Sequence, residues 1–408
     1  MLSIKRMKMF DGEMIDLCLP SFAATIMKEK GLTVLPALID PHVHFRTPGA
    51  THKEDWKSGA LAAIRGGITT VLDMPNTVPA GVSAKRLQEK QALINEQLKS
   101  IGIPLRYGLY LGADKNHFEE ISKGKECACA VKIFMGSSMG DLLVDDLPSL
   151  ERVFELSAQH DLLVAVHAED EEILKANAKK FQGITDPAIH SKIRSREAAI
   201  SATTLAIHLA AKYRARLYIL HLSTKEEVDL VRKAKLKGIS VFAETTPHHL
   251  FLNISAYQQQ KTLVQMNPPL RTSEDQSALW EGIHDGTIDT IGTDHAPHTL
   301  KEKQRPYREA PSGIPGLETL LPLLLNAVSE NKLTLRKVVE LCRLNVEKIF
   351  RLLPNRDLVM VDLELTKEVN PKELKTKCGW SPYAGYVLKG WPVYTILDDK
   401  LFPAAGAS

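Results

Sequence analysis

Eight short apolar runs rich in Val, Leu and Ile follow one another along the chain, and stretches with helical spacing separate nearly all of them. Each run has the length and composition of a buried strand. The runs span residues 32–39, 68–74, 105–111, 128–135, 162–166, 217–220, 239–243 and 287–292. Strands that alternate with helices pair in parallel. Eight such units over about 300 residues predict an α/β fold, a (β/α)8 barrel of the TIM type.

The helical stretches carry ordinary start and stop signals. Residues 55–65 end at Gly66-Gly67, and residues 83–99 begin at Ser83, a residue type that caps helix N-termini. Further helices are expected at residues 147–160, 195–213, 224–237, 317–329 and 335–344. A doubly wound open sheet is the alternative fold. It commonly carries a glycine-rich phosphate loop, and no GxGxxG follows the first run.

The pattern changes near residue 355. Residues 357–362 and 392–397 have the composition of strands, and no convincing helix lies between them. The first 36 or so residues also carry short apolar pieces separated by polar turns such as Asp11-Gly12. We therefore expect a small β domain built from residues 1–37 plus 355–408, beside a barrel domain of residues 38–354.

Composition limits the possible partners. The net charge of +3 is too small to argue for a nucleic acid or a membrane surface as partner. No run of about 18 apolar residues occurs, and the N-terminus lacks the apolar core of a signal peptide. Five cysteines, scattered and odd in number, are typical of a reducing cytoplasm. We expect a cytoplasmic protein that acts on a small molecule.

Polar side chains follow the strands at the positions where barrel enzymes carry their chemistry. His42 and His44 stand at alternate positions of an extended segment, so both point to one face, and Arg46 has the same parity. The other polar residues at such ends are Asn76, Lys132, His167, His221 and Asp294. Four histidines and an aspartate in register are better explained as ligands than as solvated loop residues. Together they can hold two divalent metal ions, with zinc the natural choice.

Lys132 stands inside a core strand, between Val131 and Ile133. A buried lysine without a partner is costly, and burial favours its neutral amine. A neutral amine can take up carbon dioxide, and the resulting carbamate is an anion with two oxygens, able to bridge two metals. A lysine that faces outward, or that pairs with an aspartate of the barrel, is the alternative.

Four segments, residues 40–46, 73–77, 267–271 and 293–298, resemble the signature segments of the dihydroorotases. These enzymes form part of the cyclic-amidohydrolase branch of the amidohydrolase superfamily. The resemblance continues to residues 377–382 and 390–395 and so covers nearly the whole chain. It implies reversible cyclisation of N-carbamoyl-L-aspartate to L-dihydroorotate, a step of de novo pyrimidine (UMP) biosynthesis, by a hydroxide held between two metals. A homodimer is a reasonable expectation for this family.

The resemblance also implies a role for each site residue. His42, His44 and Asp294 would bind the first zinc, while His167 and His221 would bind the second. Carbamylated Lys132 would bridge the two ions. Asp294 would also be the catalytic residue that carries the proton. The substrate carboxylate and ring would be held by the remaining four residues, Arg46, Asn76, His298 and Asn267.

Two alternatives stay open. Many dihydroorotases of this long-chain type have Asp at the bridging position, whereas residues 131–136 carry Lys132 and resemble the hydantoinase strand. Hydantoinase, dihydropyrimidinase and allantoinase are therefore alternatives, disfavoured by Arg46 and by the segment of residues 294–298. The second alternative is an inactive dihydroorotase-like scaffold for aspartate transcarbamoylase, which loss of the metal-ligand residues would indicate.

Residues 298–313, charged and bounded by Pro and Gly, are the candidate lid.

Overall fold

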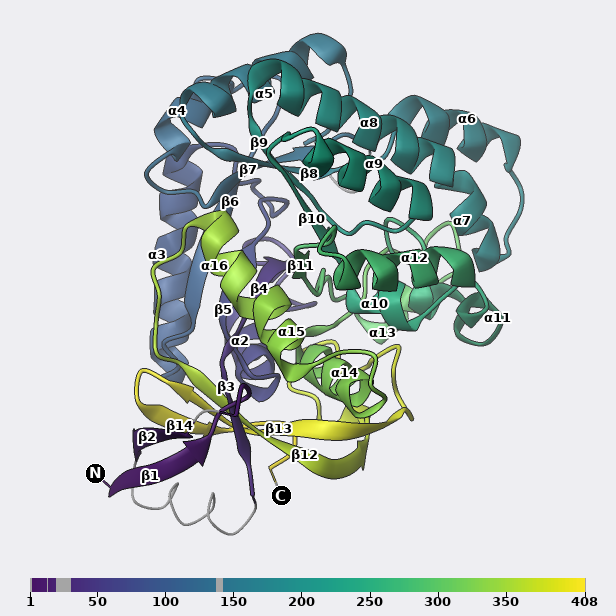
Figure 1. Cartoon of the computed structure of the whole chain (residues 1–408). Coiled ribbons are helices and arrows are strands. Elements are labelled where there is room, and N and C mark those ends of the chain that lie inside the picture. Colours follow the sequence, from purple (N-terminus) through teal and green to yellow (C-terminus); the bar gives the residue numbers. More distant parts are fainter. Residues whose placement is uncertain (1, 13, 20–30, 137–141, 408) are drawn as a thin grey trace.

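The computed structural model describes residues 2–12, 14–19, 31–136 and 142–407 (Figure 1). Its main sheet has eight parallel strands, paired in chain order from β4 to β11. They are β4 (Leu38–Val43), β5 (Ile68–Asp73), β6 (Arg106–Gly112), β7 (Ala130–Phe134), β8 (Leu163–His167), β9 (Arg216–Ile219), β10 (Val241–Thr245) and β11 (Thr290–Ile291). Val43 forms a parallel bridge to His295, which nearly closes the sheet into a barrel. The predicted TIM-type fold is confirmed.

Helices follow the barrel strands and cover the outside of the barrel (Figure 1). They are α2 (Trp56–Arg65), α3 (Ala84–Ile101), α4 (Glu120–Gly124), α5 (Leu147–Gln159), α6 (Glu171–Lys180), α7 (His190–Ile193), α8 (Arg196–Tyr213), α9 (Lys225–Leu236), α10 (Pro247–Phe251), α11 (Ala256–Gln260), α12 (Ser273–His284), α13 (Leu300–Lys303), α14 (Leu317–Ser329), α15 (Leu335–Val339) and α16 (Asn345–Phe350). Short turns η1 (Pro187–Ile189), η2 (Lys261–Val264), η3 (Glu340–Leu344) and η4 (Pro371–Glu373) complete the helical elements. Local capping explains several starts: the Ser83 side chain accepts from the backbone N–H of Arg86 at the start of α3.

Several strand and helix boundaries differ from those expected. The first apolar run, residues 32–39, is shared between two sheets, because the chain changes partners at Ala37. The Ala37 N–H donates to the Asp357 carbonyl in the terminal sheet, whereas the Leu38 N–H donates to the Gly67 carbonyl in the barrel. The last helical stretch runs past residue 344, because η3 continues directly into α16.

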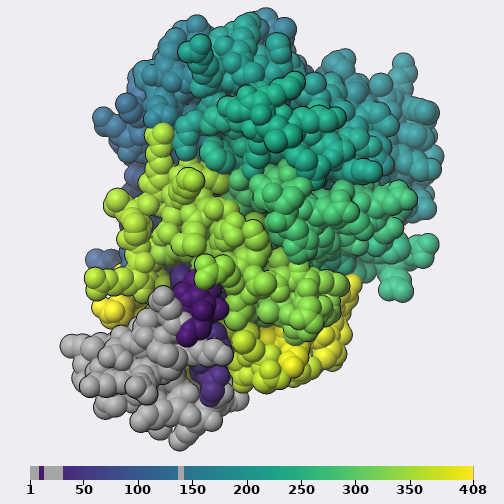
Figure 2. All heavy atoms as spheres, viewed as in Figure 1, coloured from purple at the N-terminus to yellow at the C-terminus, as the bar shows by residue number. Residues whose placement is uncertain are grey.

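A second sheet is antiparallel and combines strands from both ends of the chain. Its order is β14 (Lys400–Pro403), β13 (Val387–Leu397), β12 (Leu358–Glu368) and β3 (Thr33–Pro36). A hairpin of β1 (Leu2–Lys8) and β2 (Met14–Leu19) lies beside it (Figure 1). In Figure 2 the yellow C-terminal residues pack directly under the green helical part of the chain. The β-rich termini are confirmed, residues 20–30 lie outside the described part, and the domain boundaries stay a prediction.

The core has two layers, set by the alternation of side chains along each strand. On β7, Val131 and Ile133 belong to the large cluster that packs the helices against the barrel. Ala130 belongs to a separate cluster with Tyr110 and Tyr218. Lys132 has the same parity as Ala130, and therefore shares that side of the strand. In the described residues, we find no helix with the length and apolarity to cross a membrane.

Candidate active site

A cavity opens where the barrel strands end, and it collects the predicted site residues. Its lining consists of His42, His44, Arg46, Asn76, Lys132, Phe134, His167, His221, Asn267, Asp294, Ala296, Ser312 and Gly313. Every predicted site residue except His298 is in this lining. His298 lies immediately behind it, with its Nε2 atom 3.1 Å from the Nη2 atom of Arg46. Residues as far apart in sequence as Arg46 and His298, 252 positions, therefore share one site, as expected for strand ends of a barrel.

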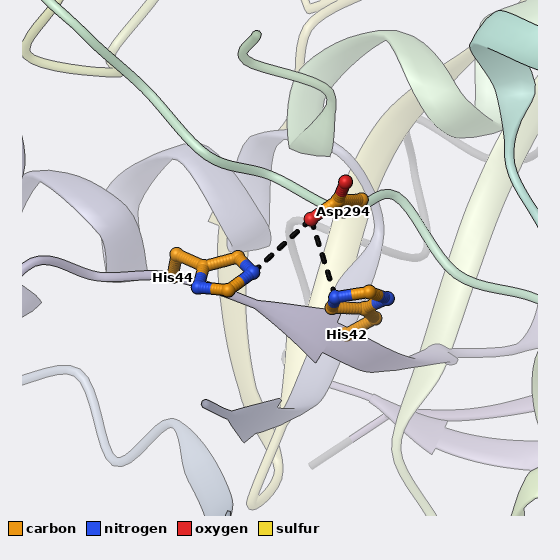
Figure 3. A group of neighbouring side chains, drawn as sticks. All are labelled: His42, His44 and Asp294. Atoms are coloured by element: carbon orange, nitrogen blue, oxygen red, sulfur yellow. Dashed lines mark ion pairs between the residues drawn. The ribbon is translucent and has the colours of Figure 1, made fainter. Parts of the chain in front are cut away.

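His42, His44 and Asp294 form a compact buried group (Figure 3). The Oδ1 atom of Asp294 lies 3.2 Å from Nε2 of His42 and 3.1 Å from Nε2 of His44. One ligand atom from each residue falls within 4.8 Å of the others. Burial opposes ionisation of Asp294, but the neighbouring His42, His44 and His221 hold its pKa well below the usual value. An ionised carboxylate beside two imidazoles suits a divalent metal.

The partners behind the imidazoles fix which nitrogen faces this group. The Nδ1 atom of His44 lies 2.7 Å from the Oδ1 atom of Asn76, and Nδ1 of His42 lies 2.8 Å from Oε1 of Glu244. Both oxygens are acceptors, so each Nδ1 carries the hydrogen. Burial lowers the pKa of His44 to about 4, so its ring is neutral and its Nε2 lone pair faces the Asp294 carboxylate. Two facing lone pairs fit a cation between them.

His167 and His221 form a second converging pair. The Nδ1 atom of His167 lies 2.9 Å from the Nε2 atom of His221. On its other side, Nε2 of His167 donates to Oε2 of Glu169 at 2.8 Å, and Nε of Arg194 donates to the same oxygen at 2.9 Å. Burial lowers the pKa of both histidines. The Nδ1 lone pair of His167 is thus aimed at His221, and the two nitrogens can act as ligands of one ion.

Lys132 is buried at 1 % exposure on the inner side of β7. Burial lowers the pKa of its amine to about 7, although Asp294 and Glu244 act in the opposite direction. Its Nζ atom lies 4.6 Å from the centre of the Phe134 ring, and among the described residues it has no hydrogen bond or ion pair. Lys132 therefore does not point outward, and among the described residues it forms no ion pair with a barrel aspartate, which were the two alternatives.

Arg46 places a cation in the cavity wall. Its guanidinium donates through Nε to the Pro297 carbonyl at 3.2 Å. In the described part of the chain, no carboxylate lies within 4 Å of it. Burial lowers the pKa of Arg46 to about 10, which still leaves the group charged near neutrality. A buried guanidinium that faces a cavity without a counter-ion is suited to binding an anion.

Three of the site residues have left-handed backbones. The φ angles are 57° at Arg46, 39° at His221 and 48° at Asp294. Such a conformation is strained for residues other than glycine and clusters at functional sites. Each of these residues lies two or three positions after a barrel strand, and its side chain remains at the cavity.

Sequence reasoning missed the residues that hold the ligands in place. Glu244, fully buried at the end of β10, accepts hydrogen bonds from His42 and from the Tyr218 hydroxyl. Glu169, two residues after His167, pairs with Arg194. Glu244 had a usable signal, because it stands at a strand end like the predicted ligands. Glu169 and Arg194 lie beyond the strand, and no local pattern marks them.

The model of the Amidohydrolase family matches residues 33–352 of the chain. The chain therefore belongs to the amidohydrolase family, whose members are metal-dependent hydrolases. Curated relatives carry a narrower name. The chain is 36% identical over 392 residues to a dihydroorotase of Methanosarcina acetivorans, with 91% of this chain and 82% of the relative covered. It is 35% identical over 387 residues to a dihydroorotase of Halobacterium salinarum, with 92% and 88% covered.

Solved structures with the same fold carry different names. An L-hydantoinase (dihydropyrimidinase) from Arthrobacter aurescens has a TM-score of 0.88 and 27% sequence identity, and 93% of this chain and 86% of that chain are covered. A dihydropyrimidinase from Brevibacillus agri has a TM-score of 0.83 and 27% identity, with 92% and 86% covered. The chain thus resembles hydantoinases in structure and dihydroorotases more strongly in sequence.

Proposed function

We propose that the chain is a dihydroorotase that catalyses the reversible cyclisation of N-carbamoyl-L-aspartate to L-dihydroorotate in pyrimidine biosynthesis. The observation that carries this proposal is the unpaired Arg46 guanidinium in the cavity wall. Dihydroorotate differs from dihydrouracil by one carboxylate. A buried cation without a counter-ion favours the anionic ring and penalises the neutral one, because the neutral ring leaves the charge unpaired.

The donor set fits two divalent cations. His42, His44 and Asp294 would hold one ion, and His167 and His221 the other. Zinc suits ligands of this kind, imidazole nitrogen with carboxylate oxygen. Such ions, when bound, supply hydroxide near neutral pH and polarise the carbonyl oxygen under attack.

Lys132 would join the two ions as a carbamate. The amine, with a pKa lowered to about 7 by burial, is largely neutral at pH 8 and can add to carbon dioxide with release of one proton. The product is the Lys132 carbamate, an anion that metal ions can neutralise. The described residues offer the uncarbamylated lysine no partner. This change converts a costly buried cation into a ligand with two oxygens.

The chain's own residues would then bind the substrate and move one proton. Arg46 and Asn76 would orient the carboxylate from within the cavity, with His298 behind Arg46. Asn267 would contact the ring. In ring opening, Asp294 would take a proton from the attacking water and deliver it to the ring nitrogen as the amide bond breaks. Ring closure uses the same steps in reverse. The neighbouring histidines hold the pKa of Asp294 well below its usual value, which keeps the carboxylate ionised and able to face a cation.

A dihydropyrimidinase is the second candidate, since proteins of that name share the fold with a TM-score up to 0.88. The inactive scaffold is less well supported, since all the expected ligand side chains line one cavity. A homodimer and a cytoplasmic location stay predictions.

The test is hydrolysis of L-dihydroorotate beside dihydrouracil, with metal content measured on the same sample. Turnover of dihydroorotate with about two metals per chain supports the proposal. Turnover of dihydrouracil alone would favour the second candidate. Bound metal with neither activity would point to another cyclic amide, and absence of both metal and turnover would favour the scaffold.

A further inference from the structure

His190 lies outside the cavity lining, yet it contacts a residue that faces the substrate space. It is the first residue of α7 and is 6 % exposed. Its Nε2 atom lies 2.9 Å from Oδ1 of Asn267 and 3.1 Å from the backbone carbonyl of Met266. Its Nδ1 atom lies 3.0 Å from the Tyr307 hydroxyl. The mechanism proposed above does not use this buried ring.

The backbone carbonyl of Met266 determines the tautomer. A carbonyl oxygen can only accept, so Nε2 of His190 carries the hydrogen and donates to both oxygens. Burial lowers the pKa of His190 to about 4, and the ring is neutral at physiological pH. Nδ1 is then an acceptor, and the Tyr307 hydroxyl donates to it. All the polar atoms of the ring are thus satisfied in one arrangement only.

This arrangement also fixes the Asn267 amide. Its Oδ1 atom accepts from His190, so its Nδ2 group lies on the opposite side of Cγ and points away from His190. Asn267 is half-buried and lines the cavity. Without a fixed partner, the Asn267 amide could rotate by 180° and present its oxygen to the substrate ring instead. With His190 in place it presents two N–H donors.

We infer that His190 is a positioning residue, which orients the Asn267 amide so that it donates to the ureido carbonyl oxygen of a cyclic substrate. This inference rests on the proposed function for the class of substrate. Tyr307, in the segment of residues 298–313, is a further member of this hydrogen-bonded chain, because its hydroxyl donates to Nδ1 of His190. That segment thereby supports the orientation of a residue at the cavity.

The experiment compares two amide replacements of His190 in the full-length, metal-loaded enzyme. His190→Gln keeps a donor near the position of Nε2, whereas His190→Asn is polar but places its amide near Nδ1. We expect KM to rise about 10-fold in His190→Asn with kcat within about threefold, because a ground-state contact is lost. His190→Gln should stay within about threefold of the wild type in KM. Equal losses in both variants would overturn the inference.

A double-mutant cycle separates positioning from a structural role. If His190 acts through Asn267, His190→Asn combined with Asn267→Ala should have a KM no higher than that of Asn267→Ala alone. A double variant whose KM rises by the product of the two single effects would overturn the inference. Asn267→Asp tests the N–H donor without altering His190, because the carboxylate presents an acceptor to the substrate ring. Its KM should be at least as high as that of Asn267→Ala, and a lower value would also contradict the inference.

The substrate is whichever of L-dihydroorotate, dihydrouracil and hydantoin the wild type hydrolyses fastest, since all three carry the ureido carbonyl. Preference for one of the neutral rings would refute the proposed function while the His190 comparison proceeds on that ring. Absence of turnover with all three would overturn both.

Discussion

At the scale of single residues, the site is organised by charges that have been removed from water. Arg46 and Lys132 are both buried cations at the same cavity, and neither has an ion pair among the described residues. They differ in what burial does to them. The guanidinium stays charged with a pKa of about 10, whereas the amine approaches neutrality at a pKa of about 7. One is suited to hold an anion, and the other to become one.

Arg46→Met should lower kcat/KM for L-dihydroorotate by about 100-fold or more, because a charge-assisted pair with the carboxylate is lost. Activity on dihydrouracil, however low, should not fall. Steady-state kinetics on both substrates give the answer. Arg86→Met, which removes an exposed arginine of α3, is the matched control and should match the wild type. An equal loss on both substrates would mean that Arg46 supports the fold and not the choice of substrate.

Lys132→Met should lower activity by about 1,000-fold and reduce the bound metal, because no bridging anion can form. Metal content by mass spectrometry and kcat are the measurements, with the exposed Lys123→Met as control. Retention of the full metal content would refute the bridging role.

The lowered pKa of Lys132 gives a pH dependence with a defined sign. The amine is protonated below about pH 7 and neutral above it, and only the neutral form adds to carbon dioxide. Reactivation of metal-depleted enzyme by metal, at a fixed concentration of dissolved carbon dioxide, should therefore become faster as the pH rises from 6 to 8. A rate independent of pH across this range would contradict the prediction.

At the scale of elements, the barrel strands matter most where they end. β11 has only two residues, but it is followed by Gly292, Thr293 and Asp294, which carry the site. The Thr293 N–H donates to Oδ1 of Asp40 at 3.0 Å, and this joins the end of β11 to β4. Gly292 stands against Glu244, the carboxylate that holds His42. The strand end is thus hydrogen-bonded to Asp40 and leaves no space for a side chain at Gly292 beside Glu244, so it packs closely against the candidate ligands.

Gly292→Ala should weaken metal binding by about 10- to 100-fold. A Cβ atom at this position would lie 2.4 Å from Oε2 of Glu244 and 3.0 Å from Cβ of His42, so Glu244 must move away. Competition with a metal chelator measures the affinity. Ile291→Val on the same strand removes one core methyl group without approaching Glu244, and should lower Tm slightly with the metal affinity intact. If Gly292→Ala binds metal as well as Ile291→Val does, the proposed packing constraint is wrong.

At the scale of the whole molecule, the C-terminal segment is fastened to the barrel beside the site. Glu318, in the first turn of α14, accepts from the backbone N–H groups of Lys375 and Thr376 at 2.8 and 3.1 Å. The fully buried Glu54, on the loop after β4, accepts from the Thr376 hydroxyl and from His295, the neighbour of Asp294. Two buried carboxylates therefore couple the C-terminal segment to the same strand ends that carry the candidate metal ligands.

Glu318→Gln should change how stability depends on pH. Burial raises the pKa of Glu318 to about 7, above the usual 4.5, so between these values the folded state binds more protons than the unfolded state. The contribution of this group to stability therefore falls as the pH rises from 4.5 to 7. Relative to Glu318→Gln, the wild type should lose roughly 2–3 kcal/mol of unfolding free energy across this range. Urea unfolding at several pH values measures this loss, with the exposed Glu274→Gln as control. Parallel curves for wild type and Glu318→Gln would refute the buried-acid assignment.

The local pattern of the sequence was sufficient for the barrel and for most of the candidate site. The apolar runs predicted the order of the barrel strands, and the strand-end positions predicted that His42, His167, His221 and Asp294 would meet. This worked because parallel strands of a barrel bring their carboxyl ends to one rim, so a position in the chain specifies a position in space. Lys132 followed from the same alternation along β7.

Only the tertiary structure decided which partners surround these residues. Glu169, Arg194, Glu244 and His190 come from separate loops and strand ends, and their contacts depend on packing between distant segments. The change of sheet at Ala37 was decided in the same way, by hydrogen bonds to Asp357 and Gly67 from opposite ends of the chain. The sequence by itself determined the fold and which candidate ligand side chains stand at the strand ends, because hydrophobic periodicity and strand ends are local. The tautomers, the charge states and the orientation of the amides were decided by the fold, because each depends on burial and on a partner that no local pattern identifies.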